Sequence, residues 1–235
     1  MRILALDSSA KAASVAMVED GNLLGEFFLN IGLTHSQTLM PMVENLLTLT
    51  NTTLAQIDAF AVSTGPGSFT GLRIGIAAVK GMAFATDIPC FAVSTLHSMA
   101  YNFTDLDDEN TVICAVMDAR CNQVYNAIFE VCDKKITRLT PDRTISIEDL
   151  YSELENLGKK IIFVGDGASL CYNKNNCMLN VQLAHESRRF QRASSVAFAA
   201  YDDFLTGKTA LSSADLLPQY LRRPQAEREL NLKRN

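Results

Sequence analysis

Ile3-Leu-Ala-Leu-Asp7 and Cys114-Ala-Val-Met-Asp118 are two short apolar stretches, and each of them ends in an aspartate. A short turn and a second β-type stretch follow each aspartate, and an acid stands at the same distance after it, Glu19 in one case and Glu130 in the other. Each stretch therefore predicts a strand-turn-strand opening. Because this pattern occurs once in each half of the chain, it indicates an internal duplication.

A second pair of matching segments supports the duplication. Ala61-Val-Ser-Thr-Gly-Pro-Gly67 has its counterpart in Ile161-Ile-Phe-Val-Gly-Asp-Gly167, and the two pairs occur in the same order. The polar stretch 102–110 is rich in acids and lacks periodicity, so it separates the halves. We expect a first half over 1–106 and a second half over 107–235, with a C-terminal segment able to pack back on the first half.

The segments between these matches alternate between strand and helix patterns. Apolar residues from Leu39 to Leu47 recur at helical spacing, and Ser68 is a suitable N-cap for a later helix. Pro41 must lie near the start of the first helix or kink it. We expect helices over 36–50 and 69–85, and strands over 2–6, 14–19, 23–29, 58–63 and 89–93. This alternation predicts an α/β layer fold.

The composition is that of a globular chain. Of the 235 residues, 48% are hydrophobic and 20% are charged, which suffices for one large core or two small ones. No apolar run approaches the length of a membrane span, and Asp7 stands where a signal peptide would still be apolar. We therefore expect a cytoplasmic protein without membrane contact. The six cysteines lack paired C-x-x-C spacing, so we expect reduced, mostly structural thiols and no zinc site.

The charge distribution differs between the chain as a whole and its C-terminus. A formal net charge of −5 argues against broad nucleic-acid binding by the chain alone, because phosphate binding needs a concentrated basic face. The segment 222–235 is basic. Its arginines and lysines outnumber its two acids: Arg222, Arg223, Arg228, Lys233 and Arg234 against Glu227 and Glu229. A solvated tail and a contact to phosphate or to a partner are both open interpretations.

The order of these elements is the plan of the actin-like ATPases and sugar kinases, a duplicated ribonuclease H-like (ASKHA) fold. In that fold the first turn of each half wraps phosphates, which requires glycine so that backbone N–H groups can approach the anion. Here the turns read Asp7-Ser-Ser-Ala-Lys and Asp118-Ala-Arg-Cys-Asn, without glycine. We therefore expect no ATP hydrolysis or phosphoryl transfer by this chain. Asp7 and Asp118 are interpreted as turn-capping residues.

The run Thr64-Gly-Pro-Gly-Ser-Phe-Thr-Gly-Leu-Arg-Ile-Gly75 is the most distinctive segment of the chain. It lacks the lysine of a Walker loop, so it is not a P-loop. It predicts a tight turn, then a helix N-terminus at which Gly67 and Ser68 could contact an anion, and then small residues that allow close helix packing. Anion binding and a purely structural role both remain open. Arg73 is placed to contact a carboxylate or phosphate near the turn.

Several segments, in order from the N-terminus to the tail, resemble the TsaB family, also called YeaZ. They are Ile3-Leu-Ala-Leu-Asp-Ser-Ser, His35-Ser-Gln-Thr-Leu-Met-Pro-Met-Val43, the glycine-rich run Gly65–Gly75, Val93-Ser-Thr-Leu96, Met117-Asp-Ala-Arg120 and Tyr220-Leu-Arg222. The resemblance implies an inactive partner of the TsaD transferases, which attach a threonylcarbamoyl group to the adenosine beside the tRNA anticodon. It also implies that an ATPase, TsaE, joins the assembly and that another enzyme makes the threonylcarbamoyl donor.

The histidines agree with an inactive member. TsaD-like relatives hold a metal with two histidines spaced one helical turn apart, and the corresponding place here holds Thr95 and Met99, with His97 out of register. His35 precedes a helix, where a hydrogen-bonding role is expected, and His185 lies in a polar stretch without a companion. We assign no catalytic residue and no metal site. The alternatives are a small-molecule kinase or ATPase of the same fold and a metal-dependent peptidase of the same superfamily.

The resemblance implies that the two helices of the first half dock on a TsaD-like protein in a heterodimer, and that the chain alone forms a homodimer through an overlapping surface. The expected interface residues are Leu39, Met40, Met42, Val43, Leu46, Phe69, Leu72, Arg73 and Ile76. Gly67, Ser68 and Arg120 are expected to contact an anion or nucleotide at this interface. We expect no cofactor on the chain alone, ATP, ADP and magnesium only in the partner complex, and tRNA contact only through that complex. Alternatively, the second half of the chain covers both helices.

Overall fold

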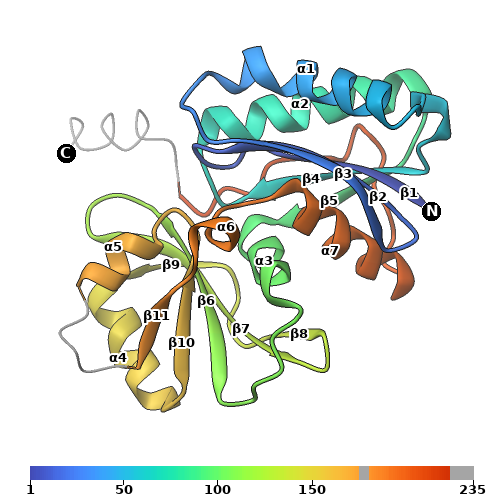
Figure 1. Ribbon diagram of the computed structural model, residues 1–235. Helices are drawn as coiled ribbons and strands as arrows, with labels where there is room; N and C mark the ends of the chain where they lie inside the picture. The colour runs from blue at the N-terminus through green and yellow to red at the C-terminus, as the bar shows by residue number, and fades with distance from the viewer. Residues whose placement is uncertain (175–179, 223–235) are drawn as a thin grey trace, which may run out of the picture.

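Strand β1 (Arg2–Asp7) lies at the centre of a five-stranded sheet with the order β3-β2-β1-β4-β5. It pairs antiparallel with β2 (Ala13–Glu19), and β3 (Asn22–Leu29) completes the predicted meander at one edge. On its other side β1 pairs parallel with β4 (Ala59–Gly65), which pairs parallel with β5 (Cys90–Ser94). The computed structural model in Figure 1 describes residues 1–174 and 180–222 of the protein.

The second sheet repeats this plan. Its central strand β6 (Thr111–Asp118) pairs antiparallel with β7 (Gln123–Cys132) and parallel with β10 (Lys160–Val164), in the order β11-β10-β6-β7-β8. The remaining strands are β8 (Lys135–Arg138), β9 (Arg143–Ser146), which pairs with β7, and β11 (Val181–Leu183). The predicted duplication and the actin-like α/β fold are confirmed.

Helices cover both faces of the first sheet. Leu4 and Leu6 on one face of β1 pack under α1 (His35–Leu49) and α2 (Phe69–Thr86), whereas Ile3 and Ala5 on the other face pack against α7 (Ala193–Leu205). This alternation follows from the period of two along a strand. Short 3₁₀ turns, η1 (Leu54–Gln56) and η2 (Tyr101–Phe103), complete the connections.

The second sheet is also covered on both faces. Helix α3 (Thr95–Ala100) packs on one face, and α4 (Ile147–Leu157) and α5 (Ala168–Asn173) pack on the other. Helix α6 (Glu186–Arg189) precedes α7. Helix α3 follows the last strand of the first sheet, yet it packs on the second sheet, and α7 follows the second sheet, yet it packs on the first. The two helices contact each other between the sheets (Figure 1).

The segment after α7 returns along the first half. Leu211 and Cys90 exchange two backbone hydrogen bonds of 2.7 and 2.8 Å, and Leu216 is buried in the core beneath α2. Further on, Gln219 N–H donates to the Thr64 carbonyl over 2.7 Å. The chain then reaches the second half, where an Arg222 guanidinium N–H donates to the Ala119 carbonyl. The basic tail beyond Arg222 and the sixth cysteine, Cys177, lie outside the described residues.

The observed bounds differ from the expected ones by one or two residues. Helix α1 begins at His35 and contains Pro41, and β4 and β5 each extend further toward the loop that follows them. The five cysteines in the described ranges are free thiols. No helix within 1–174 or 180–222 has the length and hydropathy needed to cross a membrane.

Candidate functional site

A cleft of about 680 Å³ opens between the two halves. The first half contributes the β1–β2 turn, the β3–α1 loop and the start of α2, and the second half contributes the β6–β7 turn and Asp166 after β10. Both strand-terminal turns of the duplicated pattern therefore meet at one cleft. The cleft is therefore the candidate place for a ligand site shared by the halves.

The turn after β1 is closed on itself. Asp7 is buried, and its Oδ1 accepts hydrogen bonds from the Ser9 N–H over 2.9 Å and from the Ser9 hydroxyl over 2.8 Å. The Ser63 hydroxyl donates to the other carboxyl oxygen, Oδ2. Burial raises the pKa of Asp7 above its ordinary value, although these hydrogen bonds oppose the shift. Asp7 thus caps the turn, and its oxygens are directed into the protein.

The glycines of the run 65–75 allow α2 to begin directly against this turn. A Cβ atom on Gly71 would lie 2.0 Å from the Ser8 carbonyl oxygen, and one on Gly67 would lie 2.4 Å from the Ser9 carbonyl oxygen. The contacts include hydrogen bonds, since Ser68 N–H donates to the Ser9 carbonyl over 2.7 Å and the Ser8 hydroxyl donates to the Gly71 carbonyl over 2.9 Å. Gly67 and Gly71 therefore allow the start of α2 to pack closely against the turn after β1.

Ser68 is the N-cap of α2, as the sequence predicted, and its hydroxyl oxygen accepts from Gly71 N–H over 3.3 Å. Gly67, Ser68 and Arg120 all line the cleft. The structure therefore brings the three expected anion contacts to one cavity. Their role in binding an anion stays a prediction.

The turn after β6 is open, in contrast to the turn after β1. Arg120, Cys121 and Asn122 have φ values of 66°, 53° and 58°, so three consecutive residues adopt the left-handed conformation that non-glycine residues rarely adopt. Asp118 accepts from Arg120 N–H over 2.7 Å, and the Arg120 guanidinium lies 3.5 Å from the other carboxyl oxygen. The Arg120 side chain is 81% exposed. Asp118 therefore caps its turn while the arginine remains available to a ligand.

Aromatic and basic side chains meet where α2 begins. The rings of Phe69 and Tyr220 stack with centroids 4.3 Å apart, and Arg73 Nε donates to the Tyr220 hydroxyl over 2.8 Å. The sequence predicted roles for Phe69 and Arg73 but none for Tyr220. Lys11 and Arg222 also line the cleft. The sequence predicted no role for Lys11, whereas it placed Arg222 in the basic C-terminal segment, for which a contact to phosphate or to a partner was one open interpretation.

Most of the expected partner-interface residues are buried in the first half of the chain itself. Leu46, for example, is 3% exposed and belongs to the core between the first sheet and its helices. The same holds for the other core-facing members of the predicted set, Leu39, Met42, Val43, Leu72 and Ile76. The helical spacing that singled them out marks the face buried against the chain's own sheet. Of the predicted set, Met40, Phe69 and Arg73 are at least partly accessible to a partner.

Other large apolar residues are exposed on α1 and α2, outside the stripes that the core buries. Phe84 on α2 is 84% exposed, Leu49 on α1 is 75% exposed, and Met40 on α1 is 45% exposed. We call Met40, Leu49 and Phe84, together with Phe69 and Arg73, the outer helical surface. Phe84 was missed from the sequence, although it follows the core residue Ala83 by one position and therefore points away from the core stripe.

Thr95, Met99 and the out-of-register His97 all lie on α3. Thr95 and Met99 lie one turn apart on α3, and both are buried. His97 stacks on Phe129 with ring centroids 5.6 Å apart, and burial, together with the nearby Arg138 charge, lowers its pKa from 6.5 to about 4. His97 is therefore a neutral packing residue at pH 7. At the cleft, His35 Nε2 lies 2.7 Å from the Ala10 carbonyl oxygen, consistent with the expected hydrogen-bonding role.

One group of potential metal ligands occurs elsewhere in the described chain. The side chains of Asp107, Cys132 and Asp133 bring their ligand atoms within 4.8 Å of one another. The two aspartates are exposed, and exposed acidic groups are common without a bound ion. None of the three lines the cleft. This group therefore adds nothing to the candidate site.

Comparisons with known proteins agree with this architecture. Residues 31–230 match the family model described as TsaD, tRNA N6-adenosine threonylcarbamoyltransferase. The tRNA threonylcarbamoyladenosine biosynthesis protein TsaB of Bacillus subtilis is 29% identical over 97% of this chain and 96% of its own length, and that of Escherichia coli is 36% identical over 71% and 72%. The solved structure of YeaZ from Pseudomonas aeruginosa superposes with a TM-score of 0.80 at 27% identity, covering 94% of this chain and 99% of that one. On these matches and the duplicated fold, the chain belongs to the TsaB (YeaZ) family of tRNA threonylcarbamoyladenosine biosynthesis proteins.

Proposed function

We propose that this chain is a non-catalytic subunit that binds a TsaD-like transferase through the outer helical surface and thereby supports threonylcarbamoylation of tRNA. The observation that carries the proposal is the exposure of large apolar side chains on α1 and α2, above all Phe84. Isolated exposed apolar residues are normal, but α1 and α2 contact each other and together expose three large apolar side chains, Phe84, Leu49 and Met40, which suits docking of a partner helix.

The closed turn after β1 supports the non-catalytic part of the proposal. Phosphoryl transfer in this fold needs a turn whose backbone amides and strand-terminal carboxylate face the phosphates. Here the Asp7 carboxylate is turned inward to Ser9 and Ser63, and the first amide of the α2 turn, Ser68 N–H, is donated to the Ser9 carbonyl. At the site of the metal-binding histidines in the transferases, Thr95 and Met99 are buried.

Binding activates a partner only if the bound surface fits the active conformation of that partner better than the inactive one. The outer helical surface would hold the TsaD-like transferase in the conformation competent for transfer. A TsaE-like ATPase would join this heterodimer, and in the absence of both the same apolar surface would pair two copies of the chain. ATP, ADP and magnesium would belong to the partner complex.

The test is a reconstitution with the TsaD-like and TsaE-like proteins, tRNA, ATP and the threonylcarbamoyl donor. Because Leu46 is buried, Leu46→Asp would report on folding rather than on docking, so the informative variant is Phe84→Glu. Phe204→Glu is a matched control, since Phe204 is an exposed aromatic residue on α7, on the opposite side of the first sheet.

We expect Phe84→Glu to lose co-purification with the transferase and to lower the modification rate at least tenfold, and we expect Phe204→Glu to retain both. Normal modification by a folded Phe84→Glu protein would refute the docking surface. Product that is unchanged when the chain is omitted would refute the function. ATP turnover by the isolated chain would refute the non-catalytic assignment and favour the kinase or ATPase alternative.

A further inference from the structure

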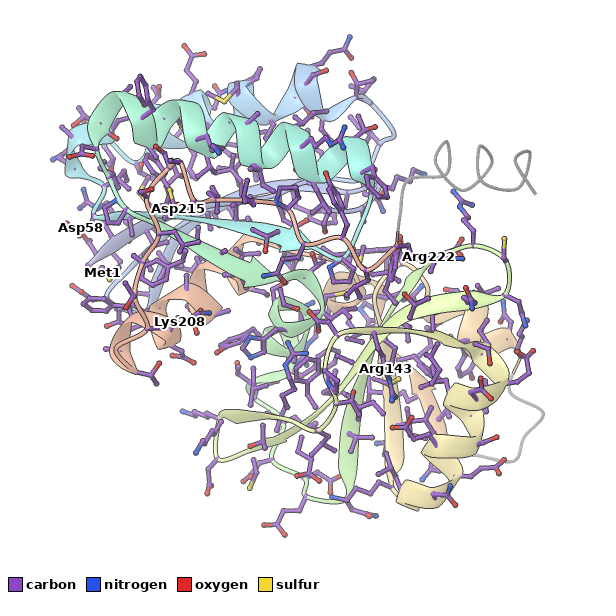
Figure 2. The ribbon with its side chains drawn as sticks, turned by 180° about the vertical axis from the view of Figure 1, so that it is seen from behind. Met1, Asp58, Arg143, Lys208, Asp215 and Arg222 are labelled. Atoms are coloured by element: carbon purple, nitrogen blue, oxygen red, sulfur yellow. The ribbon has the colours of Figure 1, made fainter. Side chains whose placement is uncertain are left out.

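Three basic side chains from separate segments converge on the cleft. Lys11 comes from the β1–β2 turn, Arg120 from the β6–β7 turn, and Arg222 from the end of the described chain. Figure 2 shows Arg222 at the junction of the two halves. The positions are distant in sequence, so only the folded chain brings them together. We call Lys11, Arg120 and Arg222 the basic rim.

The basic rim is left without strong ion pairs. Elsewhere in the chain, arginine side chains lie close to carboxylates, as in the Arg143–Glu153 pair at 2.7 Å and the Arg192–Glu26 pair at 2.6 Å. Among residues 1–174 and 180–222, no carboxylate lies within 4.0 Å of Lys11 or Arg222, and Arg120 approaches Asp118 only to 3.5 Å. Two of the three cations thus have no carboxylate partner and the third has one exposed ion pair, an arrangement that suits an anionic ligand.

The acids of the cleft limit where that anion can lie. Asp118 and Asp166 follow the ends of β6 and β10 and also line the cleft, so a compact phosphate group at these strand ends would meet two carboxylates. The glycine-lined cradle that would bind a nucleotide's phosphates is closed by the Ser8 and Ser9 contacts. The charges therefore favour a polyanion that passes across the mouth of the cleft over a nucleotide within it.

We propose that the basic rim binds the phosphodiester backbone of tRNA, in a sequence-independent manner. This inference rests on the proposed function, which makes tRNA the polyanion present in the assembly, and it replaces the expectation that tRNA is contacted only through the partner. The partly exposed ring of Tyr220, fixed by Phe69 and Arg73, offers an adjacent stacking surface. The sequence beyond Arg222 continues the positive charge, since Arg223, Arg228, Lys233 and Arg234 outnumber its two acids.

The direct test measures the affinity of the full chain for a labelled tRNA transcript by fluorescence anisotropy, over a series of salt concentrations. The triple variant Lys11→Gln/Arg120→Gln/Arg222→Gln is expected to bind at least tenfold more weakly at low salt. The slope of its log affinity against log salt concentration should be shallower by the equivalent of about three phosphate contacts. The charge-matched control Lys134→Gln/Lys135→Gln/Lys160→Gln alters the starts of β8 and β10, away from the cleft, and is expected to bind as the parent does.

A cross-linking experiment locates the RNA. Cys121 is exposed beside Arg120, so a photo-crosslinker on this thiol, in a protein whose Cys132 and Cys177 are serine, is expected to form a conjugate with tRNA. The matched protein that keeps only Cys132 among these three is expected to form none. Equal yields from both labelled proteins would overturn the location.

Three results would overturn the proposal itself. The first is an unchanged tRNA affinity in the triple variant. The second is complete displacement of tRNA by millimolar ATP, which would indicate a mononucleotide site. The third is loss of binding only when 223–235 is deleted, which would assign binding to the tail. Failure of this proposal is separable from failure of the docking proposal. The triple variant should still co-purify with the transferase, whereas Phe84→Glu should lose the transferase and keep its tRNA affinity.

Discussion

The turn after β1 and the turn after β6 occupy equivalent places in the two halves, yet they are built for different purposes. In the first, Asp7 is buried and hydrogen-bonded to Ser9 and Ser63, and α2 packs directly on the turn. In the second, Asp118 is partly exposed and three left-handed residues present the Arg120 side chain to the cleft. The comparison teaches that equivalent turns of a duplicated fold can differ in role: one is a packing centre, and the other presents an exposed side chain to the cleft.

The largest effect is expected where α2 meets the closed turn. In Gly71→Ala the new Cβ would lie 2.0 Å from the Ser8 carbonyl oxygen, and both partners are backbone, so neither can move aside cheaply. We expect a loss of about 3 kcal/mol or more in the free energy of unfolding, measured by urea denaturation. A loss below about 1 kcal/mol would show that the turn is not a packing centre.

Substitution of the two strand-end aspartates tests the comparison directly. Asp7→Ala leaves the buried hydroxyls of Ser9 and Ser63 without their acceptor, so we expect a loss of about 2–3 kcal/mol in the free energy of unfolding. Asp118→Ala removes a partly exposed turn cap, and we expect about 0.5 kcal/mol. Equal losses in the same denaturation assay would contradict the division of roles.

A third prediction concerns the helix that the first half contributes to the second sheet. The pKa of His97 on α3 is about 4 in the folded protein against 6.5 in the unfolded chain, so the unfolded chain binds the proton first as the pH falls. As the pH falls from 6.5 to 4, protonation of this residue in the unfolded chain should therefore lower the free energy of unfolding by about 3 kcal/mol. The difference in unfolding free energy between pH 7 and pH 4.5 should shrink in His97→Gln. An unchanged difference would mean that His97 ionises freely in the folded state.

An effect of the opposite sign, a gain in stability, is expected at a second glycine of α2. Apart from the adjoining backbone of α2 itself, no atom of the described residues would lie within 4 Å of a Cβ on Gly81, which is exposed on the helix far from the closed turn. Gly81→Ala should stabilise the protein by about 1 kcal/mol through helix propensity alone. Thermal denaturation of both variants should show a higher melting temperature for Gly81→Ala and a lower one for Gly71→Ala, although both change glycine to alanine in the same helix. Destabilisation of the Gly81→Ala protein would contradict this account.

Much of the fold was predictable because it depends on local patterns. The apolar stretches that end in Asp7 and Asp118, the glycine pairs that follow the later strands, and the helical spacing from Leu39 to Leu47 identified the duplication and most elements of the first half to within one or two residues. The resemblance to the TsaB family is confirmed by relatives along most of the chain.

The arrangement of the site was less predictable, because it depends on contacts between distant segments. Spacing identified the apolar face of α1 and α2 correctly, but it could not show that the chain's own sheet buries this face, as Leu46 illustrates. Phe84 and Met40 lie on the other face of these helices, where no periodic signal distinguishes a docking residue from a solvated one. Lys11, Arg120 and Arg222 meet only in the folded chain.

The exchange of α3 and α7 between the sheets has a consequence for the history of the molecule. A chain cut near residue 106 would leave the α7 face of the first sheet bare in one fragment, and the α3 face of the second sheet bare in the other. Each half on its own would therefore expose one apolar face of its sheet, and we expect neither half to fold without the other. The halves are expected to melt together in one transition, and to complement each other when the two fragments are produced in the same cell.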